Sequence, residues 1–274
     1  FPNETGGVID DLIVYQLSPN DYMLVVNAAN IEKDWKWLEQ QKKGFDVQLE
    51  DLSDKTILLA VQGPKAIESL QSLTDVSLKE IAYYSHQQGT FADCESVVIA
   101  NTGYTGSGGV ELYFDKKYAS TIWNEILTIG AKPIGLSARD TLRLEMGYCL
   151  YGNELNDNSS PIAAGLGWVT KPETHCVGAS ILQNQKENGT PQKLVGLQLL
   201  ERGIPRSEYE VFDLTEKPIG KITSGTQSPS LQCGIGLAYI EKENAKVDHN
   251  VLIKIRTKFV SAKIVNPPFL KPTL

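Results

Sequence analysis

The chain has 274 residues, of which 41% are hydrophobic and 22% are charged, and its formal net charge is -7. This composition is typical of a folded globular protein, and the length is sufficient for two packed domains. The acidic balance argues against a nucleic-acid partner, which would require clustered Lys and Arg, and no apolar run approaches the roughly 20 residues that span a bilayer.

The first part of the chain is predicted to begin with a hairpin and a helix. Residues 7–17 and 22–27 are rich in Val, Ile, Leu and Tyr, and the turn sequence Ser18-Pro-Asn-Asp21 separates them. Asn30 is suited to the N-cap of a helix that extends to about Lys43. Apolar spacing places Ile31, Trp35 and Leu38 on the buried face of this helix.

Strands and helices continue to alternate up to residue 190. The pattern predicts strands at residues 55–61, 90–101 and 109–114. It predicts helices at residues 66–73 and 117–129, and a third helix that starts at Ser137.

The character of the sequence changes after the Asn188-Gly-Thr-Pro191 break. Short β-branched runs follow at residues 194–199, 219–223, 235–240, 251–255 and 260–265. Such evenly spaced short strands predict a second domain that resembles a β-barrel.

The spacing of cysteine and histidine gives no support for a metal site. The four cysteines and three histidines are scattered, with no C-x-x-C pair and no H-E-x-x-H helix. We therefore expect no metal, and reduced thiols in a cytoplasmic compartment rather than a disulfide framework.

Two adjacent acids, Asp10 and Asp11, interrupt the first apolar run. Strand alternation would send their side chains to opposite faces, so one should point inward. A buried carboxylate without partners is costly. The inward acid would therefore serve either a structural hydrogen-bond network or a cationic ligand.

The glycine-rich segment 101–109 and the helix that starts at Ser137 also carry polar candidates. Tyr104 lies in the glycine-rich turn and Glu111 in the apolar run after it, and the simplest interpretation is a tight hairpin. In the helix, Asp140 can pair with Arg143, which leaves Arg139 without a local counterion at the positive helix start. An anionic ligand or an interdomain ion pair would satisfy Arg139.

Taken together, the motifs resemble the glycine cleavage system aminomethyltransferases. The similar segments occur in family order along essentially the whole chain: residues 6–14, 24–28, 60–64, 102–106, 138–145, 150–154, 165–168 and 223–229. The resemblance implies an α+β fold with mixed sheets and packed helices around a central cavity, plus a C-terminal β-barrel. We expect the folate-binding region at residues 1–190 and the barrel at residues 191–274.

The resemblance also implies a reaction. The family transfers a one-carbon unit from the aminomethyl group on the dihydrolipoyl arm of H-protein to tetrahydrofolate, and releases ammonia. Tetrahydrofolate would be a co-substrate and lipoate would be carried by the partner. The family's catalytic acid corresponds to Asp10, and Asp11 would be structural.

The folate contacts follow from the same resemblance, residue by residue. Glu111 corresponds to a pterin-binding carboxylate, and Arg139 to the cation that holds folate's glutamate tail. The remaining expected folate contacts are Tyr104, Tyr148, Trp168 and Asn27.

The chain departs from the family pattern in two respects. Ser107 and Gly108 replace an acidic pair in the glycine-rich turn, and nothing corresponds to a family N-terminal segment, so we expect the chain to begin inside the first domain. Two alternatives share the fold. One is a non-transferase folate-binding protein of iron-sulfur cluster assembly, because the segment around Cys149 weakly resembles the cysteine motif of those proteins. The other is the folate domain of a sarcosine or dimethylglycine dehydrogenase.

Overall fold

The computed structural model describes residues 1–272 and divides the chain into two compact units. The barrel unit contains Phe1–Leu12, Val26–Asn30 and Arg143–Lys271, whereas the sheet unit contains Ile13–Val25 and Ile31–Leu142. Mixed helices and sheets together with a closed barrel confirm the predicted α+β fold.

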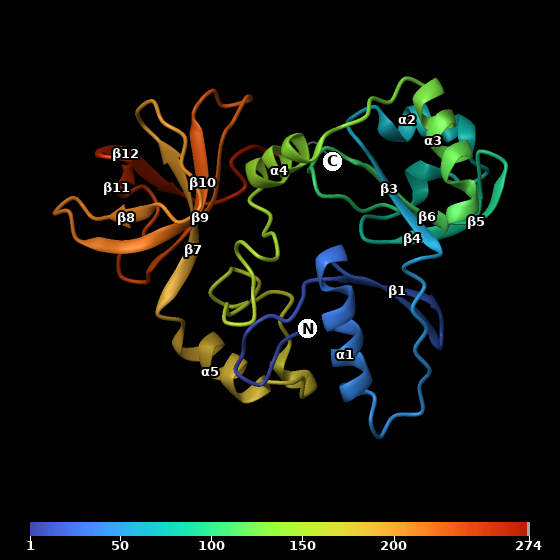
Figure 1. Cartoon of the computed structure of the whole chain (residues 1–274), viewed down its shortest axis with the longest axis horizontal. Helices are drawn as coiled ribbons and strands as arrows, with labels where there is room; N and C mark the ends of the chain where they lie inside the picture. The colour runs from blue at the N-terminus through green and yellow to red at the C-terminus, as the bar shows by residue number, and fades with distance from the viewer. Residues whose placement is uncertain (273–274) are drawn as a thin grey trace. The chain divides into compact units, whose positions relative to one another are not determined.

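The sheet unit is built on a four-stranded antiparallel sheet of order β3-β6-β5-β4 (Figure 1). The strands are β3 (Thr56–Gln62), β4 (His86–Phe91), β5 (Cys94–Ala100) and β6 (Gly109–Asp115). Alternation along the strands gives the sheet two apolar faces. One face packs against α2 (Ala66–Leu70) and α3 (Ala119–Thr128).

The other face of this sheet is covered by the hairpin of β1 (Ile13–Ser18) and β2 (Asp21–Val25). Tyr15 of β1 packs there with Val98 of β5 and Tyr113 of β6. Glu111 has the same parity in β6 as Tyr113, so it belongs to the hairpin face.

The hairpin was predicted correctly, but its first strand begins later than expected. The prediction that Asp10 and Asp11 lie within a strand is wrong, because β1 starts at Ile13. The segment before it bonds elsewhere: the Val8 N–H donates to the Asn156 carbonyl (3.0 Å). That pairing removes residue 8 from the hairpin ladder.

The predicted strand at residues 90–101 contains β5, but its first residues belong to β4 and to the turn of a second hairpin. The chain turns at Ala92 (φ 50°) and Asp93 (φ 59°), which separates β4 from β5. Two consecutive residues with positive φ form the tight turn that suits the twist of paired strands. The turn carries no Gly or Pro, the residues by which such turns are usually predicted, so the pattern did not indicate it.

The helices differ from their predictions mainly at their ends. α1 spans Ile31–Gln41, and its buried residue is Asp34, whereas the three apolar residues expected on the buried face are only half-buried. α4 spans Leu136–Glu145, so Ser137 lies inside the helix and not before it. α5 (Ala179–Asn188) was not predicted.

The barrel unit contains a closed six-stranded barrel of order β10-β7-β12-β11-β8-β9 (Figure 1). Its strands are β7 (Gln192–Leu199), β8 (Glu210–Phe212), β9 (Pro218–Gln227), β10 (Gly234–Glu241), β11 (Asn250–Ile255) and β12 (Lys258–Val265). Inward Val, Ile and Leu side chains fill the interior. The predicted barrel is confirmed, with β8 as the strand that the sequence pattern missed.

Candidate functional site

The Asp10 carboxylate lies in the barrel unit, where two asparagines hold it. Its exposed fraction is 0%. Oδ1 accepts from the side-chain amides of Asn27 (2.8 Å) and Asn30 (2.5 Å), and Oδ2 accepts from the Asn27 backbone N–H (2.9 Å). Asn30 directly precedes α1, as expected of an N-cap, and its side-chain amide is bonded to Asp10. Residue 10 precedes the hairpin in the chain, and residues 27 and 30 follow it. These hydrogen bonds therefore join the two chain segments that flank the hairpin.

Asp11 has different surroundings from its neighbour. It is half-exposed, and its carboxylate and carbonyl oxygens each lie 3.0 Å from the Asn27 amide nitrogen. Partial burial, together with the negative charge of Asp10, raises the pKa of the Asp11 carboxyl above its ordinary value. The predicted division into one inward and one outward acid is therefore present, although neither acid is in a strand.

The Glu111 carboxylate lies among hydroxyl groups on the hairpin face of the sheet. Its Oε2 accepts from the Thr102 hydroxyl (2.5 Å) and from the Tyr113 hydroxyl (3.3 Å), and Tyr15 bonds in turn to Thr102 (2.9 Å). Burial, reinforced by the Glu111 charge, raises the pKa of Tyr113 strongly, so the phenol stays a proton donor. Within residues 1–272, Oε1 of Glu111 has no hydrogen-bond partner, which leaves it as an acceptor for a ligand.

Tyr104 and Arg139 are brought together in the sheet unit. The guanidinium carbon of Arg139 lies 4.7 Å from the centroid of the Tyr104 ring, which is a cation–π geometry. Arg139 is exposed and Tyr104 is half-buried. A planar cation fixed on an aromatic face suits the binding of a carboxylate.

Gln62 is a residue that the sequence reasoning did not single out. Its side-chain amide donates to the carbonyls of Thr102 (3.1 Å) and Val110 (3.1 Å), and so joins the two ends of the glycine-rich loop. A Cβ on Gly103 would lie 1.8 Å from the Gln62 Oε1, so only glycine permits this approach. The only earlier signal was its place in the segment 60–64.

Tyr148 and Trp168 belong to the barrel unit, with Asp10 and Asn27, whereas Tyr104, Glu111 and Arg139 belong to the sheet unit. The Tyr148 side chain is half-buried, and the Trp168 side chain is 71% exposed. The neighbouring Cys149 is also in the barrel unit. Burial, with the nearby Glu154 charge, raises the pKa of its thiol to about 12, so at neutral pH it is a thiol and a poor nucleophile.

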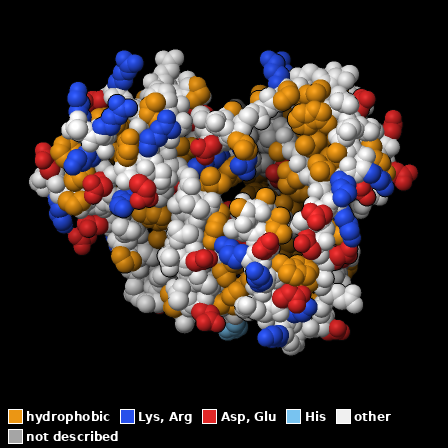
Figure 2. Space-filling view, in the orientation of Figure 1, with side chains coloured by type: hydrophobic (Ala, Val, Ile, Leu, Met, Phe, Trp, Pro, Cys, Tyr) orange, Lys and Arg blue, Asp and Glu red, His pale blue; other side chains and the backbone are white. Residues whose placement is uncertain are grey.

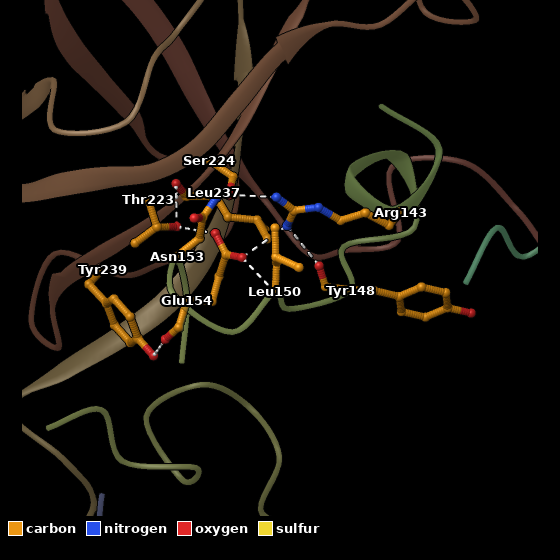
Figure 3. A network of polar contacts seen from close by, with 9 residues as sticks. All are labelled: Arg143, Tyr148, Leu150, Asn153, Glu154, Thr223, Ser224, Leu237 and Tyr239. Carbon is orange, nitrogen blue, oxygen red and sulfur yellow. Dashed lines mark hydrogen bonds and ion pairs between the residues drawn. The ribbon is translucent and has the colours of Figure 1, made fainter. Parts of the chain in front are cut away.

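A buried ion pair in the barrel unit was not predicted. Arg143 Nη1 lies 2.9 Å from Glu154 Oε2, and both side chains are 0% exposed. Arg143 also donates to the Ser224 hydroxyl (2.7 Å) on β9 (Figure 3). Glu154 and Ser224 were noted only as members of family-like segments, because spacing in sequence cannot show contacts such as Thr223–Glu154 and Arg143–Ser224, which are 69 and 81 residues apart.

No group of three or more His, Cys, Asp or Glu among residues 1–272 could hold a metal ion. Over the barrel, basic and acidic side chains are interspersed on the visible face (Figure 2). The helices of the described chain include none that is long and apolar enough to cross a membrane.

Comparisons with known proteins agree with the fold. Residues 1–174 match the family model of the GCVT N-terminal domain, and residues 192–271 match that of the glycine cleavage T-protein C-terminal barrel domain. The chain is similar to a crystal structure of glycine cleavage system aminomethyltransferase T from Bartonella henselae. The TM-score is 0.90 and the identity 30%, over 99% of this chain and 75% of that one.

Curated relatives are more similar in sequence. The chain is 51% identical to the aminomethyltransferase of Flavobacterium psychrophilum and 46% identical to that of Bacillus cereus. The alignments cover 99% and 98% of this chain and 76% and 74% of the relatives. An N-terminal region of antiparallel sheets and helices followed by a closed barrel thus defines the class as a two-domain aminomethyltransferase fold. The chain belongs to the glycine cleavage T-protein family.

Proposed function

We propose that this aminomethyltransferase uses tetrahydrofolate as the one-carbon acceptor and the aminomethyl group on lipoylated H-protein as the donor. The products are methylenetetrahydrofolate, ammonia and the reduced dihydrolipoyl arm. The observation that carries the proposal is the match of both family domains, together with a relative that is 51% identical over 99% of the chain. Free cysteines throughout the described chain support a reducing compartment, for which we propose the cytoplasm.

Asp10 is the proposed catalytic acid. Attack by a folate nitrogen on the aminomethyl carbon passes through an iminium-like centre, on which positive charge develops. A carboxylate that is already in place stabilises that charge more in the transition state than in the ground state. The three N–H donors on Asp10 support this role, because they hold the charge in one position.

Glu111 and Arg139 are the proposed anchors of the two ends of folate. The Glu111 Oε1 can accept an N–H from the aminopyrimidine edge of the pterin, while Oε2 is held by Thr102 and Tyr113. Arg139 on Tyr104 can bind the glutamate carboxylates of the tail. Asn27, Tyr148 and Trp168 complete the proposed folate contacts, and Asn27 is supported by its bonds to Asp10.

The reaction is tested with purified protein, aminomethyl-loaded lipoylated H-protein and tetrahydrofolate. Methylenetetrahydrofolate and ammonia should form in equal amounts, and omission of either substrate should abolish methylenetetrahydrofolate. Folate binding without H-protein-dependent turnover would instead indicate a non-transferase folate-binding protein of this fold.

The roles of the two anchors are distinguished with tetrahydropteroate, a ligand that lacks the glutamate tail. Arg139→Gln should raise the Kd for tetrahydrofolate about tenfold, which is the factor for about 1.4 kcal/mol, and leave the Kd for tetrahydropteroate unchanged. Glu111→Gln should weaken both ligands, since both contain the pterin. Equal effects of Arg139→Gln on the two ligands would remove Arg139 from the tail site.

A further inference from the structure

The buried pair of Arg143 and Glu154 is connected to the backbone of Tyr148. The Tyr148 N–H donates to the Arg143 carbonyl (3.0 Å), and Arg143 Nη1 donates to the Tyr148 carbonyl (2.9 Å). Arg143 therefore binds both main-chain polar groups of residue 148. Glu154 Oε2 accepts from the N–H of Leu150 (2.9 Å), which holds the chain two residues further on.

The barrel supplies the other side of the same network (Figure 3). On β9, Thr223 donates to Glu154 Oε1 (2.5 Å), and the Ser224 hydroxyl accepts from Arg143 Nη2 (2.7 Å). On β10, the Tyr239 hydroxyl donates to the Glu154 carbonyl (2.8 Å). Strand β9 of the closed barrel thus orients both charged side chains, and β10 holds the backbone of Glu154.

Stability alone does not account for such a pair. Removing two charges from water is costly, and apolar residues of similar volume often give equal or greater stability. The backbone carbonyl of Tyr148 accepts from Arg143 Nη1, and its ring extends away from Arg143 and Glu154 in Figure 3. These bonds to the backbone set the direction of the Cα–Cβ bond of Tyr148, from which the ring projects.

We propose that Arg143, Glu154 and Ser224 are positioning residues that set the placement of Tyr148 and thereby the affinity for tetrahydrofolate. The inference rests on the proposed function, in which Tyr148 contacts folate. The C-terminal barrel then has a second role besides its own packing. Through β9 it influences the affinity for tetrahydrofolate.

Two serines of one segment provide a matched pair of variants. Ser224 bonds to Arg143, whereas Ser228 donates to Glu145, which has no bond to Tyr148. Both are nearly fully buried, at 4% and 0% exposure. Ser224→Ala should raise the KM for tetrahydrofolate about tenfold with little change in kcat. Ser228→Ala should lower the Tm and leave KM unchanged, and equal KM values in the two variants would overturn the inference.

A double variant separates positioning from stability. Arg143→Met leaves the Glu154 charge buried without its partner, so it should be strongly destabilising. Adding Glu154→Gln removes that charge and should recover much of the Tm. The KM for tetrahydrofolate should stay raised, because the hydrogen bond from Arg143 to the Tyr148 carbonyl is still missing. A KM that returns to the wild-type value together with the Tm would show a merely structural pair.

Tyr148→Ala distinguishes failure of this inference from failure of the proposed folate contact. The variant should raise the KM, and Ser224→Ala should add little in the Tyr148→Ala background, since both changes act through one side chain. A raised KM in Tyr148→Ala with a normal KM in Ser224→Ala overturns the network while the contact stands. A normal KM in Tyr148→Ala removes the contact, and the inference with it.

Discussion

Asp10 and Asp11 are adjacent in the chain, but their carboxyl groups differ in burial and in the number of N–H donors. Three N–H donors surround the first, whereas the second is partly buried beside a like charge. The same substitution, Asp to Asn, therefore has opposite expected effects at the two positions. Each position serves as the control for the other.

Asp10→Asn should destabilise the protein as well as slow turnover. An Asn side chain replaces one accepting oxygen with a donating NH₂ group, which would face Asn27 or Asn30 N–H groups. An unsatisfied buried group of this kind costs about 1–3 kcal/mol. Urea unfolding measures the loss, and turnover is compared at equal folded fraction. Wild-type turnover per folded molecule would remove Asp10 from the mechanism.

Asp11→Asn should stabilise the protein at neutral pH. The pKa of Asp11 is raised in the folded state above 3.8, so folding favours the protonated form. The stabilising contribution of the protonated form is full below pH 3.8 and is lost as the pH rises through the raised folded pKa. The variant should therefore have the higher Tm at neutral pH, and the difference should vanish below pH 3.8. A difference that is independent of pH would contradict this account.

At the scale of elements, the glycine-rich loop is fixed by the pairing of β3 with β6. Gln62 at the end of β3 is opposite Gly109 at the start of β6, and the Gly63 N–H donates to the Gly108 carbonyl (2.9 Å). The backbone at both ends of the loop is therefore set by the sheet. The sheet thereby also sets the backbone positions of Tyr104 in the loop and of Glu111 in β6.

Gly109→Ala should be far more destabilising than Gly63→Ala. Both glycines have a positive φ, 123° and 132°, so a side chain is strained at either position by about 1–3 kcal/mol. A Cβ on Gly109 would also lie 2.2 Å from the Val61 carbonyl oxygen, a backbone atom of the paired strand, whereas nothing lies within 4 Å at Gly63. Urea unfolding of the two variants measures the difference, and equal losses would show that φ alone decides.

The sequence predicted most elements, because periodicity is a local property. It missed the turn at Ala92 and Asp93, which lacks Gly and Pro, and the strand β8, which has only three residues. Element ends depended on distant partners: residue 8 bonds to residue 156 and not to the hairpin.

The candidate site was predictable to the extent that charge and local spacing determine it. Adjacent acids indicated one buried carboxylate, and the helix start indicated a cation in need of a partner. The partners themselves were not predictable: Asn30 for Asp10, the Tyr104 ring for Arg139, and β9 for Arg143. Family motifs marked segments 150–154 and 223–229 without showing that they meet.

At the scale of the whole molecule, the two units are interleaved along the chain. The hairpin at Ile13–Val25 belongs to the sheet unit, while the segments on both sides of it belong to the barrel unit. Linear patterns cannot predict such a division. The boundaries proposed from sequence, 1–190 and 191–274, therefore remain a proposal about domains along the chain, whereas the units are groups of contacts in space.

Each unit has its own hydrophobic core, so a core substitution should act mainly on the unit that contains it. Leu112 in the sheet unit and Ile253 in the barrel are both 0% exposed, and replacement of either by Ala should cost about 2–5 kcal/mol. Hydrogen exchange read by mass spectrometry separates the two effects, since exchange reports local opening. Leu112→Ala should speed exchange in β3, β5 and β6 more than in the barrel, and Ile253→Ala should do the reverse. If either variant speeds exchange equally in both units, the two cores unfold as one cooperative structure.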